Sequence, residues 1–310
     1  MTVRPLLELR ARVRRSLRDV FERRGFVEVD TPVLSREVLP EAHIDPVAVA
    51  LEGDDRPRFL QASPEALMKR LLARESGPIY QFAQSFRAGE RGSLHDVEFC
   101  LLEWYEPGAT LADVPGIVAD LATATLGTEG VDTLTCREAF RAHAGLDPFA
   151  ATAADLEAAA ATAGVDVPTA ADLDRWDRAF ELVLSQVVQP RLGRGVPVLL
   201  VDWPASQAAF ARLDERGVAR RFELFVEGVE LANGWEEETS RSVLEARIAA
   251  ANEVRARSGR ARLPLPAELV AAHGAGMPAG VGAALGFDRL VMLAAGARSI
   301  HEVRGLRDES

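Results

Sequence analysis

Charged and aromatic side chains suited to chemistry gather on one predicted hairpin, whose strands cover residues 80–87 and 97–105. Alternate side chains of a strand share a face, so Phe99, Glu103 and Tyr105 point to the same side. The end of the first strand and the polar loop add the charged residues Arg87, Glu90, His95 and Asp96. Such a loop suits closure over a polyphosphate, because arginine binds phosphate oxygens bidentately. Spacing alone also fits a surface hairpin with solvated charges.

A second group of carboxylates, Glu223, Glu230 and Glu237, is spaced by seven residues along an acidic segment. Seven is an odd spacing, which would alternate faces in an ideal strand. Convergence of these side chains therefore requires a β-bulge at Gly228 and a turn at Asn233-Gly234. Converging carboxylates can hold Mg²⁺ on phosphate oxygens or receive an ammonium group. An acidic edge strand with an Asn-Gly turn is the alternative.

A glycine-rich stretch over residues 280–286 leads into an apolar helical pattern that begins at Phe287. Its glycines follow the order GxGxxxG, and no βαβ unit comes after them, which excludes a dinucleotide-binding fingerprint. Arg289 stands at the start of the predicted helix. We therefore expect its guanidinium to reach a buried anion.

The composition describes an acidic globular chain, with 36 Lys and Arg against 47 Asp and Glu, a formal charge of −11 and 48% hydrophobic residues. Disordered, fibrous and membrane-spanning classes are excluded, and the absence of a signal-peptide pattern predicts a cytoplasmic protein. Cys100 and Cys136 form no metal-spaced pair. Lys69 is the sole lysine, so the chain has no GxxxxGK[ST] loop. If the chain uses ATP, arginines and a metal must hold the phosphates.

Hydrophobic periodicity predicts the elements that position these groups. An amphipathic helix opens the chain and ends at Gly25, and Ser63 caps a second helix with Pro64 at its first position. The segment 111–190 is mostly helical and forms an insertion. The other predicted elements are strands at 26–29, 58–62, 196–201 and 221–231, a helix at 242–257, and a strand followed by a helix over 280–295.

Three of these segments resemble the motifs of the class II aminoacyl-tRNA synthetases. Residues 25–34 (GFVEVDTPVL) resemble motif 1, the segment from Phe86-Arg87 to Phe99 resembles motif 2, and residues 286–290 (GFDRL) resemble motif 3. Within the class, three segments resemble the lysyl-tRNA synthetase group: Ser63-Pro64-Glu65, Lys69-Arg70-Leu71 and residues 230–234 (ELANG). The phrase PASQA at 204–208 and the length resemble the truncated lysyl-synthetase paralogues, which ligate (R)-β-lysine to a lysine of translation elongation factor P.

The resemblance implies an α+β class II synthetase catalytic fold, with a mixed, mostly antiparallel sheet flanked by helices. It implies one catalytic domain over residues 1–310, a mostly helical insertion at 111–190 and no anticodon-binding domain. Pro32 corresponds to the motif 1 proline at the family's dimer interface, so we expect a homodimer. The acidic net charge argues against a nucleic-acid partner.

The resemblance also implies an AMP-forming ligase that uses ATP and Mg²⁺ to activate (R)-β-lysine and transfers it to a lysine of elongation factor P. The catalytic residues would be Arg87, Glu230 and Arg289, and the metal ligands Glu223 and Glu230. The nucleotide would be bound by Arg87, Glu90, His95, Asp96, Phe99, Glu230, Leu231, Gly286 and Arg289, with Phe99 and Arg289 on either side of adenine. The amino acid would be bound by Ser63, Glu65, Glu103, Tyr105, Asn233, Glu237 and Ala284.

Ala284 replaces a glycine that is usual in lysyl-tRNA synthetases. Its methyl group would favour an amine displaced by one carbon, as in β-lysine, unless it only packs against a neighbouring strand. Other functions stay open at this stage: tRNA charging by a lysyl-tRNA synthetase, a non-catalytic regulator, or another carboxylate-activating enzyme such as an amide ligase of the asparagine-synthetase type.

Overall fold

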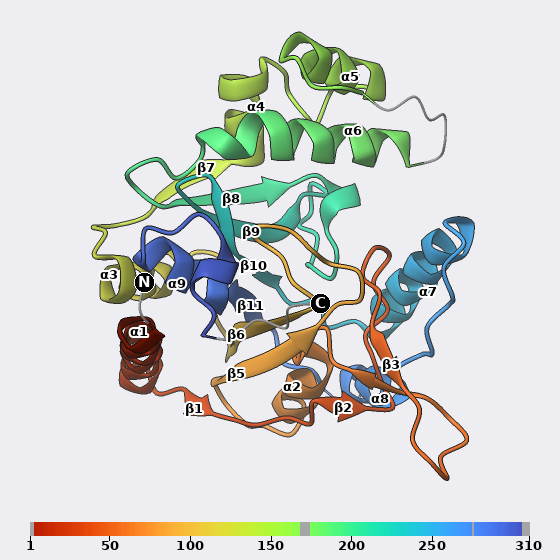
Figure 1. Ribbon diagram of the computed structural model, residues 1–310. Coiled ribbons are helices and arrows are strands. Elements are labelled where there is room, and N and C mark those ends of the chain that lie inside the picture. The colour runs from red at the N-terminus through yellow and green to blue at the C-terminus, as the bar shows by residue number, and fades with distance from the viewer. Residues whose placement is uncertain (1–2, 168–173, 275, 306–310) are drawn as a thin grey trace. The chain divides into compact units, whose positions relative to one another are not determined.

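The computed structural model describes residues 3–167, 174–274 and 276–305 (Figure 1). Its contacts divide the chain into two compact units. The first unit comprises Met1–Ala109, Ala124–Leu126 and Glu237–Ser310, and the second comprises Thr110–Thr123 and Gly127–Glu236. The predicted single domain covers both units and stays a prediction. No helix in the described ranges is long and apolar enough to cross a membrane.

The first unit is built on four strands in the order β1 (Val27–Glu28), β5 (Ile79–Phe86), β6 (Glu98–Pro107) and β11 (Gly280–Gly286). β1 runs parallel to β5, whereas β5, β6 and β11 pair antiparallel. β5 and β6 form the predicted hairpin. The sheet is therefore mixed and mostly antiparallel, as expected for the fold class.

Helix α1 (Val3–Arg23) covers one face of this sheet because its apolar residues recur at helical spacing. Phe21 of α1 stacks on Tyr80 of β5 with ring centroids 4.6 Å apart, and it also contacts Trp104 of β6 at 5.6 Å. Gly25 follows the helix with φ of +79°, the left-handed conformation predicted for its end. Helix α9 (Phe287–Ala294) follows β11 and places Phe287 against Phe82 of β5, with centroids 5.5 Å apart.

Helix α2 (Glu65–Leu72) packs on the opposite face of the sheet, where its buried Met68 and Leu72 meet Ile79 and Tyr105. The prediction for its start is one residue out: Pro64 is the cap and the helix begins at Glu65. Ser63 still serves the helix, because its hydroxyl accepts a hydrogen bond from the Glu65 amide at 3.0 Å. The unit is completed by α7 (Arg241–Arg257), α8 (Ala267–Gly274), the short helix η4 (Ile300–Glu302) and a small sheet in the order β2 (Leu34–Ser35), β4 (Arg58–Leu60), β3 (Val47–Val49).

The second unit has a sheet in the order β10 (Val229–Glu236), β9 (Ala219–Val226), β8 (Val198–Trp203), β7 (Asp132–Thr135), with only β7 and β8 parallel. Its helices pack on a core that includes Phe140, Phe180 and Trp203. The segment predicted as a helical insertion contains these helices and also β7; its residues 168–173 lie outside the described ranges. The helical elements assigned wholly or mainly to this unit are α3 (Val114–Leu126), α4 (Cys136–Ala144), α5 (Ala153–Thr162), α6 (Arg175–Val183), η1 (Leu184–Val188), η2 (Gln189–Arg191) and, beyond the predicted insertion, η3 (Ala205–Gln207).

The hairpin of β9 and β10 corrects the predicted turn. The turn lies at Glu227-Gly228, where both residues have positive φ, and Asn233 is inside β10. The bulge lies between Glu230 and Ala232 instead of at Gly228. Two residues of positive φ match the right-handed twist of the flanking strands, which favours a tight hairpin at this point over the Asn-Gly pair.

Asp288 ties three elements of the first unit together and is 4% exposed. It accepts a hydrogen bond from the Cys100 amide of β6 at 3.0 Å and pairs with Arg10 of α1 at 2.8 Å. We predict that Asp288→Ala lowers the unfolding free energy by about 3–5 kcal/mol, because the half-buried Arg10 and the buried Cys100 amide lose the carboxylate that binds them. Glu8→Ala, which breaks the exposed Arg4–Glu8 pair, should change it by about 0.5 kcal/mol or less. Urea unfolding of both variants measures this, and equal losses would contradict it.

Candidate active site

The α2 side of the first unit's sheet carries the predicted polar residues. The antiparallel register sets Tyr105 beside Gly282 and Glu103 beside Ala284, and paired residues of neighbouring strands share a face. Phe99 follows at an alternate position of β6. The prediction that Phe99, Glu103 and Tyr105 point to one side is therefore confirmed.

Glu103 is the most deeply buried carboxyl group on this face, with 1% of the residue exposed. The Ser63 hydroxyl donates to its Oε1 at 2.6 Å, and the Tyr105 hydroxyl donates to its Oε2 at 3.3 Å. Burial nevertheless raises the pKa of Glu103 to about 8. At neutral pH the group is mainly protonated, so a cation bound beside it would release a proton.

Lys69 of α2 joins two of the predicted site residues, although it was not itself predicted to be one. Its ammonium nitrogen lies 2.6 Å from Glu65 Oε1 and 2.6 Å from Glu237 Oε2. Burial acts to lower the pKa of Lys69, but the charges of Glu237 and Glu65 together hold that pKa above its ordinary value. The buried cluster thus contains a permanently charged ammonium group that sequence reasoning assigned no role.

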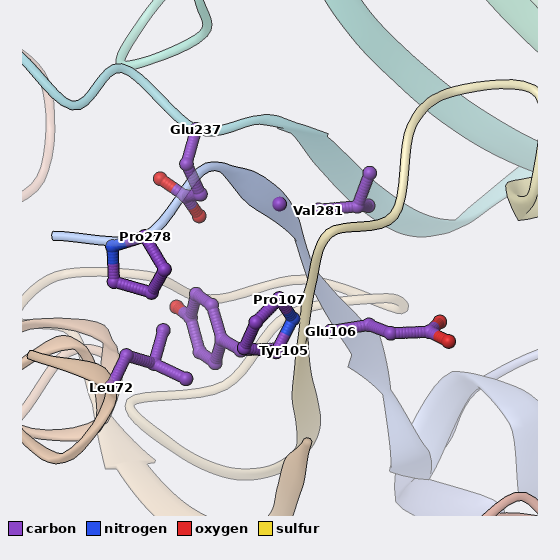
Figure 2. A pocket seen from close by; sticks show the side chains of 8 residues that line it. Leu72, Tyr105, Glu106, Pro107, Glu237, Pro278 and Val281 are labelled. Atoms are coloured by element: carbon purple, nitrogen blue, oxygen red, sulfur yellow. The ribbon is translucent and has the colours of Figure 1, made fainter. Parts of the chain in front are cut away.

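Gly282 lets this cluster approach the sheet. A Cβ atom at this position would lie 2.4 Å from Glu237 Oε1 and 2.4 Å from a ring carbon of Tyr105. Figure 2 shows the hollow beside these two side chains, with the Tyr105 ring between Leu72, Pro278 and Pro107 and the Glu237 carboxylate above it. The absence of a side chain at Gly282 is therefore a condition for the observed positions of Glu237 and Tyr105.

Arg87 follows the end of β5 and lies at the opposite end of this face from Tyr105. Its guanidinium lies 5.0 Å above the Phe99 ring, 3.4 Å from the Ala62 carbonyl and 3.5 Å from Glu90. The acid at position 90 thus reaches the arginine although the motif has one extra residue between them. The arrangement leaves a guanidinium stacked on an aromatic ring of the face that also carries the buried carboxyl cluster.

Arg289 of α9 contacts the predicted loop of the hairpin. Its Nε donates to the Leu94 carbonyl at 3.2 Å, and its guanidinium lies 2.8 Å from His95 Nε2. Gly286 caps α9 with extended backbone, which starts the helix directly after β11. The structure therefore brings together Arg289, His95 and Gly286, three of the residues predicted to bind the nucleotide.

The C-terminal segment also holds this loop, which the sequence did not indicate. Arg304 pairs with Asp96, and His301 Nε2 lies 3.0 Å from the Gly92 carbonyl. The Ile300 amide donates to the Ser93 carbonyl at 2.9 Å. Asp96, predicted to face the nucleotide, thus has its carboxylate on Arg304 in this structure.

The remaining predicted residues belong to the second unit. Glu230 pairs with Phe225 and Asn233 pairs with Glu223, so Glu223, Glu230 and Asn233 share one face of the hairpin. Leu231 is the extra residue of the bulge and is buried. Without this bulge Asn233 would turn to the opposite face.

Arg221 organises this face. It stacks 4.2 Å above the Trp203 ring, donates to the Asn233 side-chain oxygen at 3.2 Å and pairs with Glu223. Across the residues that the structure describes, no three His, Cys, Asp or Glu side chains form a metal site. Two carboxylates on one face nevertheless fit Mg²⁺, because this ion is commonly held by one or two carboxylates together with substrate phosphates.

The geometry supports activation of a carboxylate by a nucleotide more than acid–base hydrolysis. Arg87 has a guanidinium group of the kind that binds phosphate oxygens, and Glu65, Glu103 and Glu237 form a buried acidic cluster of the kind that binds ammonium groups. The histidine nearest this cluster among the described residues, His273, has its Nδ1 3.0 Å from the Leu269 carbonyl, and both cysteines are buried.

Comparison with known proteins agrees with this chemistry. The family model of class II tRNA synthetases (D, K and N) matches residues 2–306. An elongation factor P–(R)-β-lysine ligase of Edwardsiella ictaluri is 38% identical over 301 residues, which cover 95% of this chain and 92% of that protein. Proteins of the same name from Enterobacter sp. (strain 638) and Salmonella dublin are 36% identical over 306 residues, which cover 96% of this chain and 94% of each.

Both the family match and the relatives extend over nearly the whole chain, including the strands, the hairpin loop and the glycine-rich strand that form the site. The α+β fold with mixed, mostly antiparallel sheets agrees with them. The chain therefore belongs to the class II tRNA synthetase family (D, K and N).

Proposed function

We propose that the chain activates (R)-β-lysine with ATP as an aminoacyl-adenylate and transfers it to a lysine side chain of elongation factor P. The observation that carries the proposal is the buried cluster of Glu65, Glu103 and Glu237 on the sheet face that also carries Phe99 with Arg87 stacked on it. Buried carboxyl groups are costly unless they meet positive charge, and a lysine-type amino acid brings two ammonium groups. The names of the relatives support the β-amino acid and the acceptor.

The first step needs positioning and charge stabilisation more than a general base. The amino-acid carboxylate is already ionised at neutral pH, and its oxygen forms a bond to the α-phosphorus while the bond to pyrophosphate breaks. Arg87 would bind the α-phosphate, and Phe99 and Arg289 would enclose adenine. Stabilisation of the charge on the phosphorus oxygens is the main catalytic contribution expected from these residues.

Mg²⁺ would be held by Glu223 and Glu230, and when bound it would neutralise phosphate charge. Asn233 and Leu231 belong to the same hairpin, and the amide of Asn233 would contact the amino acid. Ala284, partly buried beside Glu103, would fill the space that an α-amino group needs. A methylene-sized misfit is worth about 1–3 kcal/mol, which corresponds to roughly 10- to 200-fold discrimination against α-lysine.

In the second step the amine nitrogen of the acceptor lysine forms a bond to the acyl carbon of the adenylate. AMP leaves with the electrons of the broken bond, and a proton passes from the amine to solvent. We also propose a homodimer through residues 25–34, in the cytoplasm. The exposed Val27 and Val33 of that segment support the dimer, since exposed apolar residues favour an interface.

We predict that wild-type enzyme exchanges pyrophosphate into ATP with (R)-β-lysine and more weakly with α-lysine, but not with aspartate. Arg87→Ala should reduce the rate by about 10²–10³-fold, because the α-phosphate charge loses its bidentate partner. Arg74→Ala, at an exposed arginine after α2, is the matched control and should leave the rate unchanged. Exchange by Arg87→Ala within tenfold of wild type would refute the assignment. Charging of lysine tRNA without modification of elongation factor P would favour a tRNA synthetase instead.

We predict that Gly282→Ala raises the KM for the amino acid and leaves the KM for ATP nearly unchanged. The added methyl must displace Glu237 and Tyr105, and overpacking of this kind costs about 1–3 kcal/mol. This corresponds to roughly a 5- to 150-fold rise in KM. The matched control is Gly274→Ala, where a Cβ would meet only the flexible Arg241 side chain. Exchange kinetics for both substrates check this, and an unchanged amino-acid KM would be evidence against the pocket.

We predict that affinity for the lysine-type substrate increases with pH up to about 8. The raised pKa means that Glu103 is protonated in the free enzyme below pH 8, whereas a bound ammonium group favours the carboxylate. Binding therefore releases a proton, and affinity should rise by up to about tenfold per pH unit below 8 and then level off. Calorimetry in buffers of different ionisation enthalpy detects the proton, and Glu103→Gln should abolish its release. Equal proton release by both proteins would disprove the role of Glu103.

A further inference from the structure

Lysine is used only once in this chain, at Lys69, although 36 residues are Lys or Arg. Burial does not explain the choice, because Arg255 is also 2% exposed and binds the carbonyl groups of Glu41 and Ile44 together with the Asp45 carboxylate. A chain that uses arginine at its other basic positions, buried ones included, has a compact ammonium group only between Glu65 and Glu237. The two basic side chains are not interchangeable: the ammonium is a point charge, and the guanidinium is a planar fork.

The contacts of Lys69 join segments that lie far apart in the sequence. Glu65 precedes Lys69 by one helical turn of α2, whereas Glu237 lies beyond β10 and is pressed against Gly282 and Tyr105. The exposed fractions of the Lys69 and Glu237 side chains are both 3%. Lys69 therefore fixes two carboxylates that would otherwise repel each other across a buried space.

The charge of the cluster follows from these residues. Glu65, Glu103 and Glu237 with Lys69 carry two negative charges once a bound ammonium group has ionised Glu103. Arg87 and Glu41 also act on these carboxyl groups, with charges of opposite sign. His273 of α8 also lies close enough to feel Lys69 and Glu65, but burial lowers its pKa, so it adds no charge at neutral pH. Two negative charges match the two ammonium groups that a lysine-type amino acid retains after its carboxylate joins the phosphate.

We propose that Lys69 is a positioning and specificity-determining residue, which holds Glu65 and Glu237 in place and sets the charge of the pocket to that of one diammonium amino acid. The inference rests on the proposed function. Without Lys69 the pocket would carry an excess negative charge, and repulsion would move Glu65 and Glu237 apart. Recognition of the amino acid would then weaken, while the contacts of Arg87 with the nucleotide would persist.

The experiment compares KM values of Lys69→Met, Lys69→Arg and wild type in pyrophosphate exchange with (R)-β-lysine or α-lysine. We expect Lys69→Met to raise the KM for the amino acid at least tenfold, with the KM for ATP within threefold of wild type. Lys69→Arg retains the positive charge but replaces the compact ammonium with a planar guanidinium. Its amino-acid KM should therefore lie between those of Lys69→Met and wild type. Equal changes in both KM values, or a loss of thermal stability without a change in amino-acid KM, would overturn the proposal.

A second variant covers the case in which Lys69→Met does not fold. Lys69→Met/Glu237→Gln removes one charge of each sign and restores the original net charge. We expect this double variant to fold. Its amino-acid KM should be lower than that of the single variant Glu237→Gln, although the double variant has lost one more native side chain. A double variant with a higher KM than Glu237→Gln would show that contact geometry alone acts, which contradicts the charge-matching role.

Chemical rescue gives an independent measurement. Lys69→Ala lacks the atoms of n-propylammonium, so this cation at millimolar concentration should lower the amino-acid KM of the variant, whereas n-propanol should not. If n-propylammonium has no effect and the amino-acid KM of Lys69→Ala equals that of wild type, the proposed role of Lys69 is wrong. If wild-type enzyme uses neither lysine isomer, the proposed function fails instead, and the two failures are thereby distinguished.

Discussion

The burial of three carboxyl groups around one face of a sheet is the constraint on which the rest of the site depends. An ionised carboxylate taken out of water is strongly destabilising unless positive charge or hydrogen-bond donors accompany it. Lys69 supplies the charge for Glu65 and Glu237, and hydroxyl donors from Ser63 and Tyr105 stabilise Glu103. Burial still raises the pKa of Glu103, so a cationic ligand beside it would stabilise its ionised form.

The sheet determines how closely these groups approach one another. Aromatic residues of α1 and α9 pack against one face of the sheet. This packing fixes the position of the strands whose opposite face carries the carboxyl cluster. Along β11, Gly282 leaves no room for a side chain, whereas Ala284 contributes a methyl group beside Glu103. Gly282 thus permits the close approach of Glu237, and we propose that the Ala284 methyl limits the space beside Glu103.

Local sequence patterns predicted the helices and strands well, but they did not predict contacts between residues far apart in the sequence. The shared face of Glu103 and Tyr105 follows from the two-residue period of a strand, so it could be read from the sequence. The Asn-Gly turn was wrong because the pairing of Val226 with Val229 closes the hairpin earlier and leaves Asn233 bound by Arg221 inside β10. Contacts between remote segments left no local signal. Examples are the contacts of Lys69 with Glu237 and of the C-terminal Arg304 with Asp96. The occurrence of a single lysine in the sequence was nevertheless a sign that position 69 differs from the other basic positions.

We propose that these buried acids select a lysine-type amino acid for attachment to a protein lysine. Intact-mass spectrometry of elongation factor P, incubated with the enzyme, ATP and (R)-β-lysine, tests it most directly. The account predicts a mass increase of one β-lysyl unit on a single lysine side chain, dependent on ATP. Unmodified elongation factor P under conditions in which the same enzyme preparation forms the adenylate would contradict it.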